Sequence, residues 1–230
     1  MNEERSVMNE RTRKGFSLVE MLVVIGIIAV LVAASLGGYS AVTKSAERTK
    51  CREIVTQAAI ALMTLYQNEG TWPRRLATEG KTDGRLDAEC ARQLVAGENV
   101  DMYGKKTLTS YYALRLDDDG KPTGYDRFGI VTPWAADVLR RAGRDANLQT
   151  VVSTSRHGPK TVEDHLLHFA VDLDGDGIIE GAMVGGESVT VRATAIVWCA
   201  GKDGHMEPYS RGLREDDVYS WSPGQAKMVK

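Results

Sequence analysis

The chain has 230 residues, with 29 basic and 31 acidic side chains and a formal net charge of −2 at pH 7. This length fits one head domain behind an N-terminal segment, and the balanced charge argues against a general affinity for nucleic acid. The three cysteines, Cys51, Cys90 and Cys199, allow at most one internal disulfide, and three buried thiols are an equally good interpretation.

An apolar run begins at Phe16, ends near Leu36 and contains one charged residue, Glu20. As an uninterrupted helix this run would be about 31 Å long, which matches the hydrocarbon core of a bilayer. An ionisable side chain inside such a segment costs roughly 2.5–3.5 kcal/mol at mid-depth. We therefore expect a transmembrane helix over residues 16–37, in which Glu20 has a positive partner.

Residues 15–20 read Gly-Phe-Ser-Leu-Val-Glu and follow a polar leader. This segment resembles, residue for residue, the N-terminus of type IV pilins and of type II secretion pseudopilins. The resemblance implies that prepilin peptidase removes residues 1–15 by cutting after Gly15, and that the new N-terminal Phe16 is methylated. It also implies that Glu20 meets the terminal amine of a neighbouring subunit, with a single pass through the inner membrane and the head in the periplasm.

Two other interpretations of the apolar helix are weaker. A secretory signal has an apolar region of about 7–15 residues and a small-residue cleavage site downstream, whereas this run is longer and Gly15 lies upstream of it. A plain membrane anchor gives no reason for a glutamate at the fifth position after that glycine.

From Ala41 onward the pattern changes to that of an amphipathic helix. Glu69-Gly70-Thr71-Trp72-Pro73 ends it, since glycine terminates helices and proline cannot continue them. We expect one long helix from Phe16 to about Asn68, of which residues 38–68 form an amphipathic stem. Its apolar side chains recur at spacings of three and four and are Cys51, Ile54, Val55, Ala58, Leu62, Leu65 and Tyr66.

Residues 69–230 predict one head domain of mixed structure. The helical patterns cover Leu86–Ala96 and Pro133–Ala142, and the strand-like runs cover Leu108–Leu116, Leu166–Asp172 and Val189–Cys199. We therefore expect a pilin-like α+β fold in which the long N-terminal helix packs on a small antiparallel sheet.

The first acidic segment of the head is Asp172-Leu-Asp174-Gly-Asp176-Gly177. It begins like a calcium loop, with carboxylates at alternate positions and glycine sixth. Its twelfth position is Met183 instead of a bidentate glutamate, so the helix-loop-helix calcium motif is incomplete. A tight turn between strands is the favoured interpretation, and a metal site at Asp172, Asp174 and Asp176 is the alternative.

The second acidic segment joins the turn at residues 201–204 to the pair Asp216-Asp217 and to Trp221. It resembles the C-terminal calcium loop of major pseudopilins, which has a Gly-x-Asp-Gly turn, an acidic pair and a tryptophan. The resemblance implies that Asp203, Asp216 and Asp217 bind calcium, a cation that takes six to eight oxygen ligands.

The histidines do not predict catalysis. His165 and His168 lie three apart in a strand-like run, which puts their side chains on opposite faces and argues against a shared metal. His157 and His205 lie in predicted loops without an orienting carboxylate in an obvious pattern. The sequence also has no P-loop, nucleophile elbow or Cys-x-x-Cys motif, so we do not expect an enzyme.

The expected function is that of a structural subunit of a type II secretion pseudopilus, which polymerises through its N-terminal helix and promotes protein export. Prepilin peptidase, other pseudopilins and inner-membrane components of the secretion system are the expected partners. A type IV pilus subunit for adhesion, motility or DNA uptake is the first alternative. A membrane-anchored enzyme or binding protein whose head works alone is the second.

Overall fold

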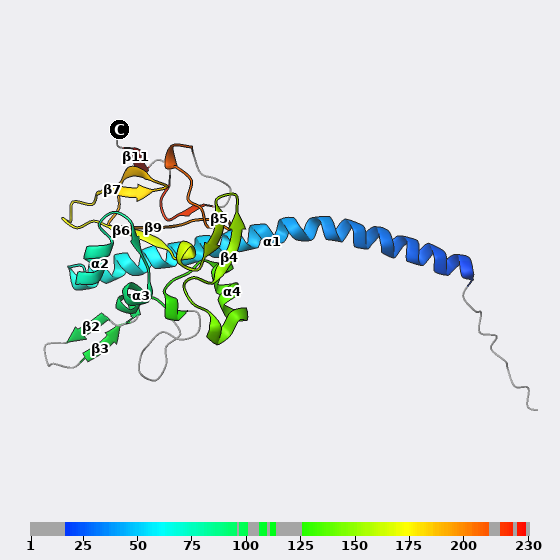
Figure 1. The fold of residues 1–230 in the computed structure, drawn as a ribbon, viewed down its shortest axis with the longest axis horizontal. Coiled ribbons are helices and arrows are strands. Elements are labelled where there is room, and N and C mark those ends of the chain that lie inside the picture. The colour runs from blue at the N-terminus through cyan, green and yellow to red at the C-terminus, as the bar shows by residue number, and fades with distance from the viewer. Residues whose placement is uncertain are drawn as a thin grey trace, which may run out of the picture. The chain divides into compact units, whose positions relative to one another are not determined.

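The computed structural model describes residues 17–95, 97–100, 106–109, 111–113, 126–211, 217–222 and 225–228. The chain divides into two compact units between Ser45 and Ala46. The first unit contains the N-terminal part of helix α1, and the second contains the rest of α1 and the head (Figure 1).

Helix α1, Leu18–Glu69, is continuous, as the sequence predicts. It ends where Gly70 adopts a φ of +68° and donates its N–H to the Tyr66 carbonyl at 2.8 Å. Glycine adopts this left-handed conformation without the steric cost of a Cβ atom, so its position fixes the end of the helix. The segment boundaries expected after residues 15, 37 and 68 stay predictions.

Side chains from one face of α1 line the main hydrophobic core of the second unit. Five of the predicted stripe residues are at most 1% exposed: Cys51, Val55, Ala58, Leu62 and Leu65. The other two, Ile54 and Tyr66, are half-buried. Full burial of one leucine contributes about 1.5–3 kcal/mol, so this stripe is a main reason that the stem and the head form one unit.

A four-stranded antiparallel sheet packs against this face of α1, with the strand order β1-β6-β9-β10. Its strands are β1 (Gly84–Arg85), β6 (His168–Val171), β9 (Ala195–Cys199) and β10 (Val218–Tyr219). Phe169 pairs with Val197 in register, and both belong to the core that α1 lines. Strand β6 confirms the strand predicted within residues 166–172, and Figure 1 shows β6 and β9 along the C-terminal part of α1.

A second antiparallel sheet, with the order β11-β8-β7, covers the opposite face of β6 and β9. Its strands are β7 (Ile179–Val184), β8 (Glu187–Val191) and β11 (Ala226–Met228). Ile196 and Trp198 of β9 pack into the core with this sheet, whereas Val197 between them packs toward α1. The centre of the head therefore has three layers, which are α1, the four-stranded sheet and the three-stranded sheet.

The single strand predicted over Val189–Cys199 is wrong, because the chain turns between β8 and β9. Arg192 donates its N–H to the Gln225 carbonyl at 3.2 Å beside the β8–β11 pairing. Two residues later, the Thr194 carbonyl accepts the Asp172 N–H at 2.9 Å beside the β9–β6 pairing. One alternating pattern thus supplies two strands in two sheets, and β9 is buried on both faces.

The helices of the head are α2 (Arg74–Glu79), α3 (Ala88–Val95) and α4 (Pro133–Ala142). The bounds of α4 are those predicted. Helix α3 begins two residues later than predicted, because Asp87 Oδ1 accepts the Cys90 N–H at 2.9 Å and so caps its N-terminus. Leu86 instead pairs with two extended segments. Its N–H donates to the Leu167 carbonyl, and its carbonyl accepts the Ile130 N–H, each at 2.8 Å.

The strand predicted over Leu108–Leu116 is confirmed only at its start, in β3 (Lys106–Thr109). Residues 111–113 are not a strand, because the N–H groups of Tyr111 and Tyr112 donate to the Leu94 carbonyl at 2.7 and 3.1 Å. The chain there turns back to the end of α3. Residues 114–116 lie outside the described residues.

Two hairpins and four short helices complete the described head. The hairpins pair β2 (Gly97–Val100) with β3, and β4 (Val151–Ser155) with β5 (Gly158–Thr161). The 3₁₀ helices are Asp126–Phe128, Gly143–Asp145, Glu163–His165 and Tyr209–Arg211. One long helix packed on antiparallel sheets confirms the predicted α+β class.

Candidate assembly and metal-binding sites

Glu20 is part of a capping box at the start of α1. The Oγ atom of Ser17 accepts the Val19 N–H at 3.3 Å, and the Glu20 carboxylate accepts the Ser17 N–H at 2.9 Å. These reciprocal bonds satisfy two N–H groups that a helix N-terminus leaves without partners, and such a cap contributes about 1 kcal/mol. Sequence reasoning gave Glu20 an assembly role only, although the signature Ser-x-x-Glu is visible in residues 17–20. Gly15 and Phe16 lie outside the described residues.

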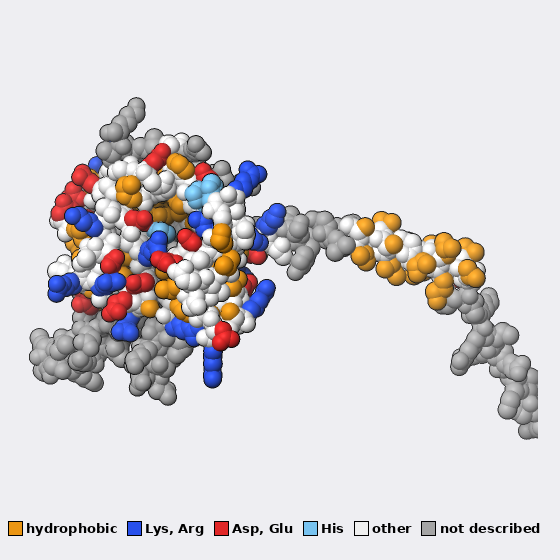
Figure 2. Space-filling model, viewed as in Figure 1, with side chains coloured by type: hydrophobic (Ala, Val, Ile, Leu, Met, Phe, Trp, Pro, Cys, Tyr) orange, Lys and Arg blue, Asp and Glu red, His pale blue; other side chains and the backbone are white. Residues whose placement is uncertain are grey.

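Large apolar side chains between Leu18 and Val32 are 45–82% exposed. Figure 2 shows them as an orange surface along the N-terminal part of α1. An exposed apolar surface of this size marks a contact with other apolar material. Among the described residues, no helix reaches the length and apolarity that a bilayer crossing requires. The transmembrane span over residues 16–37 therefore stays a prediction.

The Asp172 segment forms a tight turn. Asp172 is 3% exposed, and its two carboxylate oxygens accept the N–H groups of Gly175 and Gly177 at 2.8 and 2.7 Å. Both glycines have a φ near +80°, at +78° and +79°. Oxygens of Asp172, Asp174 and Asp176 also lie within 4.8 Å of one another. The hydrogen bond with Asp172 and the negative charge of Asp176 raise the pKa of Asp174.

The second predicted calcium segment is described at Asp203 and Asp217, and Asp216 lies outside the described residues. Asp217 is 3% exposed, and its Oδ1 accepts the Gly201 N–H at 3.2 Å. Asp203 belongs to the same turn, and its Oδ1 accepts the His205 N–H at 3.0 Å. The fold therefore brings Asp217 to the turn that carries Asp203, although each carboxylate has a backbone amide as one partner.

Trp221 closes an aromatic cluster behind this turn. It is 8% exposed, and its ring lies edge-on to Trp198 and Tyr219, with centroid distances of 5.9 and 4.9 Å. Such edge-to-face pairs contribute about 0.5–1.5 kcal/mol beyond the area that they bury. The cluster ties the C-terminal segment to β9, the strand that precedes the turn.

His165 lies in the 3₁₀ helix Glu163–His165 and not in the strand-like run that the sequence had suggested. Its side chain is completely buried, with Nδ1 3.1 Å from Thr132 Oγ1. Desolvation is the main cause that lowers the pKa of His165 to about 4. His168 lies elsewhere, with Nδ1 2.6 Å from Asp83 Oδ1.

His157 and His205 lie together, with ring centroids 3.8 Å apart, and Glu207 Oε1 is 3.9 Å from His205 Nε2. Sequence reasoning missed this group because the two histidines come from different loops. The only sequence signal was His205-Met-Glu207, in which a carboxylate follows a histidine by two residues.

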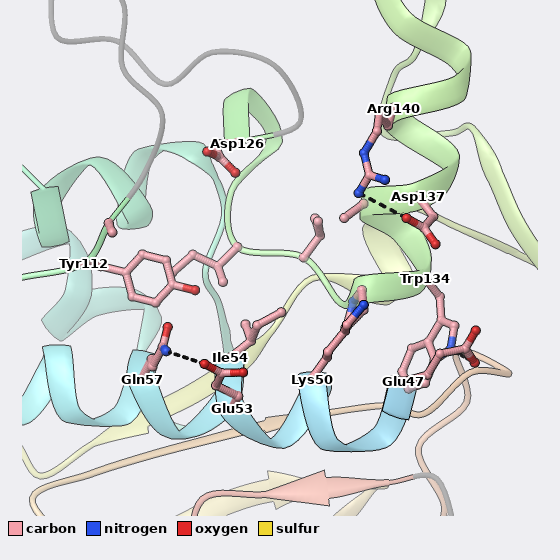
Figure 3. Close-up of a pocket in the computed structure, with 15 residues that line it drawn as sticks. Glu47, Lys50, Glu53, Ile54, Gln57, Tyr112, Asp126, Trp134, Asp137 and Arg140 are labelled. Atoms are coloured by element: carbon pink, nitrogen blue, oxygen red, sulfur yellow. Dashed lines mark hydrogen bonds and ion pairs between the residues drawn. The ribbon is translucent and has the colours of Figure 1, made fainter. Parts of the chain in front are cut away.

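A groove of about 400 Å³ lies between α1 and α4 (Figure 3). Glu47 lies at one end, where its Oε2 accepts a hydrogen bond from Trp134 Nε1 at 2.9 Å and lies 3.4 Å from Lys202 Nζ. Further along, Gln57 donates to Glu53 at 3.1 Å. The contacts of Glu47 join α4 and the turn at Lys202 to the stem, whereas the hydrogen bond between Gln57 and Glu53 lies within α1.

The thiols of Cys51 and Cys199 face each other across the core, with their Sγ atoms 2.7 Å apart. All three cysteines are free and completely buried. Burial is the main cause that raises the pKa of Cys199 well above its ordinary value. The sequence left the possible pair open, and the fold selects Cys51 on α1 and Cys199 on β9 over any pair with Cys90.

The N-terminal segment is similar to known proteins. A family model described as the prokaryotic N-terminal methylation motif matches residues 11–36, a range that contains Gly15, Phe16 and Glu20. The chain is also 27% identical over 108 residues to the type IV major pilin protein PilE1 of Neisseria gonorrhoeae, covering 41% of this chain and 66% of the relative. The chain thus carries the N-terminal methylation motif and is similar to type IV pilins.

A second relative of this pilin-like chain is the type IV major pilin protein PilE of Neisseria gonorrhoeae. The identity is 31% over 68 residues, which cover 30% of this chain and 41% of the relative. The pilin-like chain thus spans less than two thirds of the length of either relative. No solved structure matches it.

Proposed function

We propose that this pilin-like chain is a structural, non-catalytic subunit of a type II secretion pseudopilus. In this proposal prepilin peptidase cuts after Gly15, and the mature chain passes once through the inner membrane with its head in the periplasm. Subunits polymerise through α1, together with other pseudopilins and inner-membrane components of the secretion system, and the filament promotes protein export. The exposed apolar side chains of α1 support polymerisation, since they are suited to packing among neighbouring helices.

The contact between Asp217 and the turn at residues 201–204 is the observation that favours a pseudopilus. The Gly201 N–H donates to Asp217, and Trp221 packs behind the segment on β9. This arrangement agrees with the C-terminal ending that the sequence resembles. Burial of a carboxylate costs free energy unless hydrogen bonds compensate it, so an acidic tail without a structural role would stay in water. A loop that must keep its shape in a filament benefits from a buried, hydrogen-bonded carboxylate.

A type IV pilus subunit is the second candidate, and the names of both relatives favour it. The two candidates predict different phenotypes when the gene is deleted. Loss of exported proteins from the medium, with surface fibres unchanged, supports the pseudopilus. Loss of surface fibres with export intact supports the pilus.

Processing is the first prediction. Intact-mass analysis of the chain produced together with a prepilin peptidase should find residues 1–15 removed and one methyl group added to Phe16. Without the peptidase the chain should stay uncut. Gly15→Val should block the cut because a side chain at this position obstructs the junction, and Lys14→Gln is the matched control that should still be cut. A head that is equally functional uncut would instead favour a membrane-anchored binding protein.

We also propose that Asp203, Asp216 and Asp217 bind calcium, as the C-terminal ending that the sequence resembles implies. Saturation with a ligand at about 100 times its Kd stabilises a protein by about 2.7 kcal/mol. Removal of calcium with EGTA should therefore lower the melting temperature of the head by roughly 5–10 °C.

Two variants locate the calcium. Asp217→Asn should remove the EGTA effect, whereas Asp174→Asn, which changes an exposed carboxylate of the other acidic turn, should keep it. The reverse pattern would move the calcium to the Asp172 segment. A melting curve that EGTA leaves unchanged in the parent chain would contradict both sites.

A further inference from the structure

We propose that His157, His205 and Glu207 form a binding site for a divalent transition metal ion of the zinc type. One ligand atom from each residue lies within 4.8 Å of the other two. The imidazole rings are nearly parallel, with 3.8 Å between centroids and 19° between planes, and Glu207 Oε1 lies 3.9 Å from His205 Nε2. Figure 2 shows pale blue histidine side chains at the surface of the head.

The two loops that supply these ligands are held by their own hydrogen bonds. His157 lies in the turn between β4 and β5, where its N–H donates to Ser155 Oγ at 3.1 Å. His205 follows β9, and its N–H donates to Asp203 Oδ1 at 3.0 Å. Asp203 therefore orients the backbone of a proposed ligand. Because these bonds already hold the two loops in place, metal binding loses less conformational entropy than it would with mobile loops.

The position of Glu207 is fixed by close packing against the second sheet. A Cβ atom on Gly185 would lie 2.0 Å from the Glu207 carbonyl oxygen, and Gly185 has a φ of +58°. Only glycine allows this approach between the β7–β8 turn and the loop. The Glu207 residue is 5% exposed and His205 has a side chain that is 30% exposed, so the site has one buried wall and one open side.

The donor set selects the class of metal. Two imidazole nitrogens and one carboxylate oxygen suit zinc and similar ions, whereas calcium prefers oxygen ligands alone. Zinc binds nitrogen at about 2.0–2.1 Å, so ligand atoms around a tetrahedral ion are roughly 3.3 Å apart. The ligand atoms lie within 4.8 Å of one another, so no pair must approach by more than roughly 1.5 Å, and rotation of the exposed His157 side chain can provide this.

Electrostatics favour a cation at this position. A carboxylate that is largely removed from water, such as Glu207, gains more from a nearby positive charge than an exposed one does. The Lys160 side chain passes close to Gly204 of this loop, and its ammonium lies 3.9 Å from an Asp164 oxygen, which offsets its charge. Three protein ligands leave the fourth position of a tetrahedral ion to water. The metal would join the β4–β5 hairpin to the loop that carries Asp203.

Zinc titration of the metal-free full-length chain in mild detergent tests the site. The parent chain should retain one zinc ion per chain after gel filtration, and excess calcium should not displace it. His157→Gln should weaken zinc binding by more than about tenfold, since even the loss of an outer-sphere partner costs about 10–100-fold. Because His157 is exposed, this variant should keep the parent's melting temperature without metal.

Arg156→Gln is the matched control, because it changes an exposed residue of the same turn that offers no ligand atom. It should bind zinc at least as tightly as the parent chain. Proton NMR in the presence of zinc should shift the ring signals of His157 and His205 and leave those of His165 unchanged. Failure of the parent to retain zinc, or unchanged binding by His157→Gln, would overturn the proposal.

Discussion

Glu20→Ala should abolish filament assembly and leave the head folded. In the filament, the Glu20 carboxylate is expected to attract the terminal amine of a neighbouring subunit by about 4 kcal/mol at about 4 Å, before desolvation is subtracted. Loss of this attraction lowers an association constant by up to about 1,000-fold. Glu20 lies in the unit that ends at Ser45, so the melting temperature of the head should not change. Electron microscopy of sheared filaments, with the peptidase present, measures the result.

The capping box makes a sharper test possible, because glutamine can replace glutamate in it without the charge. Glu20→Gln should therefore fail to assemble, as the alanine variant does. Ser17→Ala is the complementary control: it removes the hydrogen bond to the Val19 N–H, costs about 1 kcal/mol of helix stability and keeps the charge at Glu20. Filaments of Glu20→Gln at the parent's level would leave capping as the only role of this side chain.

Acidification from about pH 7 to about pH 4.5 should remove about 2 kcal/mol of the free energy of unfolding through His165. Desolvation lowers the pKa of His165 from 6.5 to about 4, with a smaller contribution from Lys160. The carboxylates of Asp164 and Asp203 oppose this shift. Because the folded pKa lies below the unfolded one, the unfolded chain binds the proton first. The stabilisation is thus complete above the unfolded pKa and is lost as the pH falls toward about 4.

Urea unfolding at the two pH values measures this loss. His165→Asn can keep a hydrogen bond to Thr132 but has no imidazole to protonate, so its stability should fall by about 2 kcal/mol less than that of the parent. His157→Asn, which changes an exposed histidine, should behave as the parent does. An equal loss in the parent and in His165→Asn would assign the acid sensitivity to carboxylates elsewhere.

Local signals predicted α1, α3 and α4, whereas the short helix α2 was not predicted. The end of α1 follows from Gly70 and the bounds of α4 from Pro133 and Gly143, because a helix start or stop depends on residues that are close in sequence. The start of α3 was less accurate. Asp87 is a preferred N-cap residue, but its apolar neighbour Leu86 fits the helical period equally well, and only pairing with Leu167 makes it extended.

The strands were harder, because their partners are distant in sequence. Ile196 and Val197 are both buried, one in each core, so the alternation of polar and apolar residues that marks a half-exposed strand is absent from β9. The turn between β8 and β9 has no proline or glycine to mark it; its position depends on hydrogen bonds to Gln225 and Asp172. The period-two pattern over Val189–Cys199 therefore predicted one strand where the structure has β8 and β9.

The sequence by itself determined the N-terminal motif, the long helix with its buried stripe and the α+β class, since these depend on neighbouring residues and on one repeated spacing. Tertiary structure alone decided that Cys51 faces Cys199 and that His157 joins His205 and Glu207. Each of these groups combines loops or elements that are far apart in the chain. Their distances are set by how the layers pack, which no local pattern of residue types encodes.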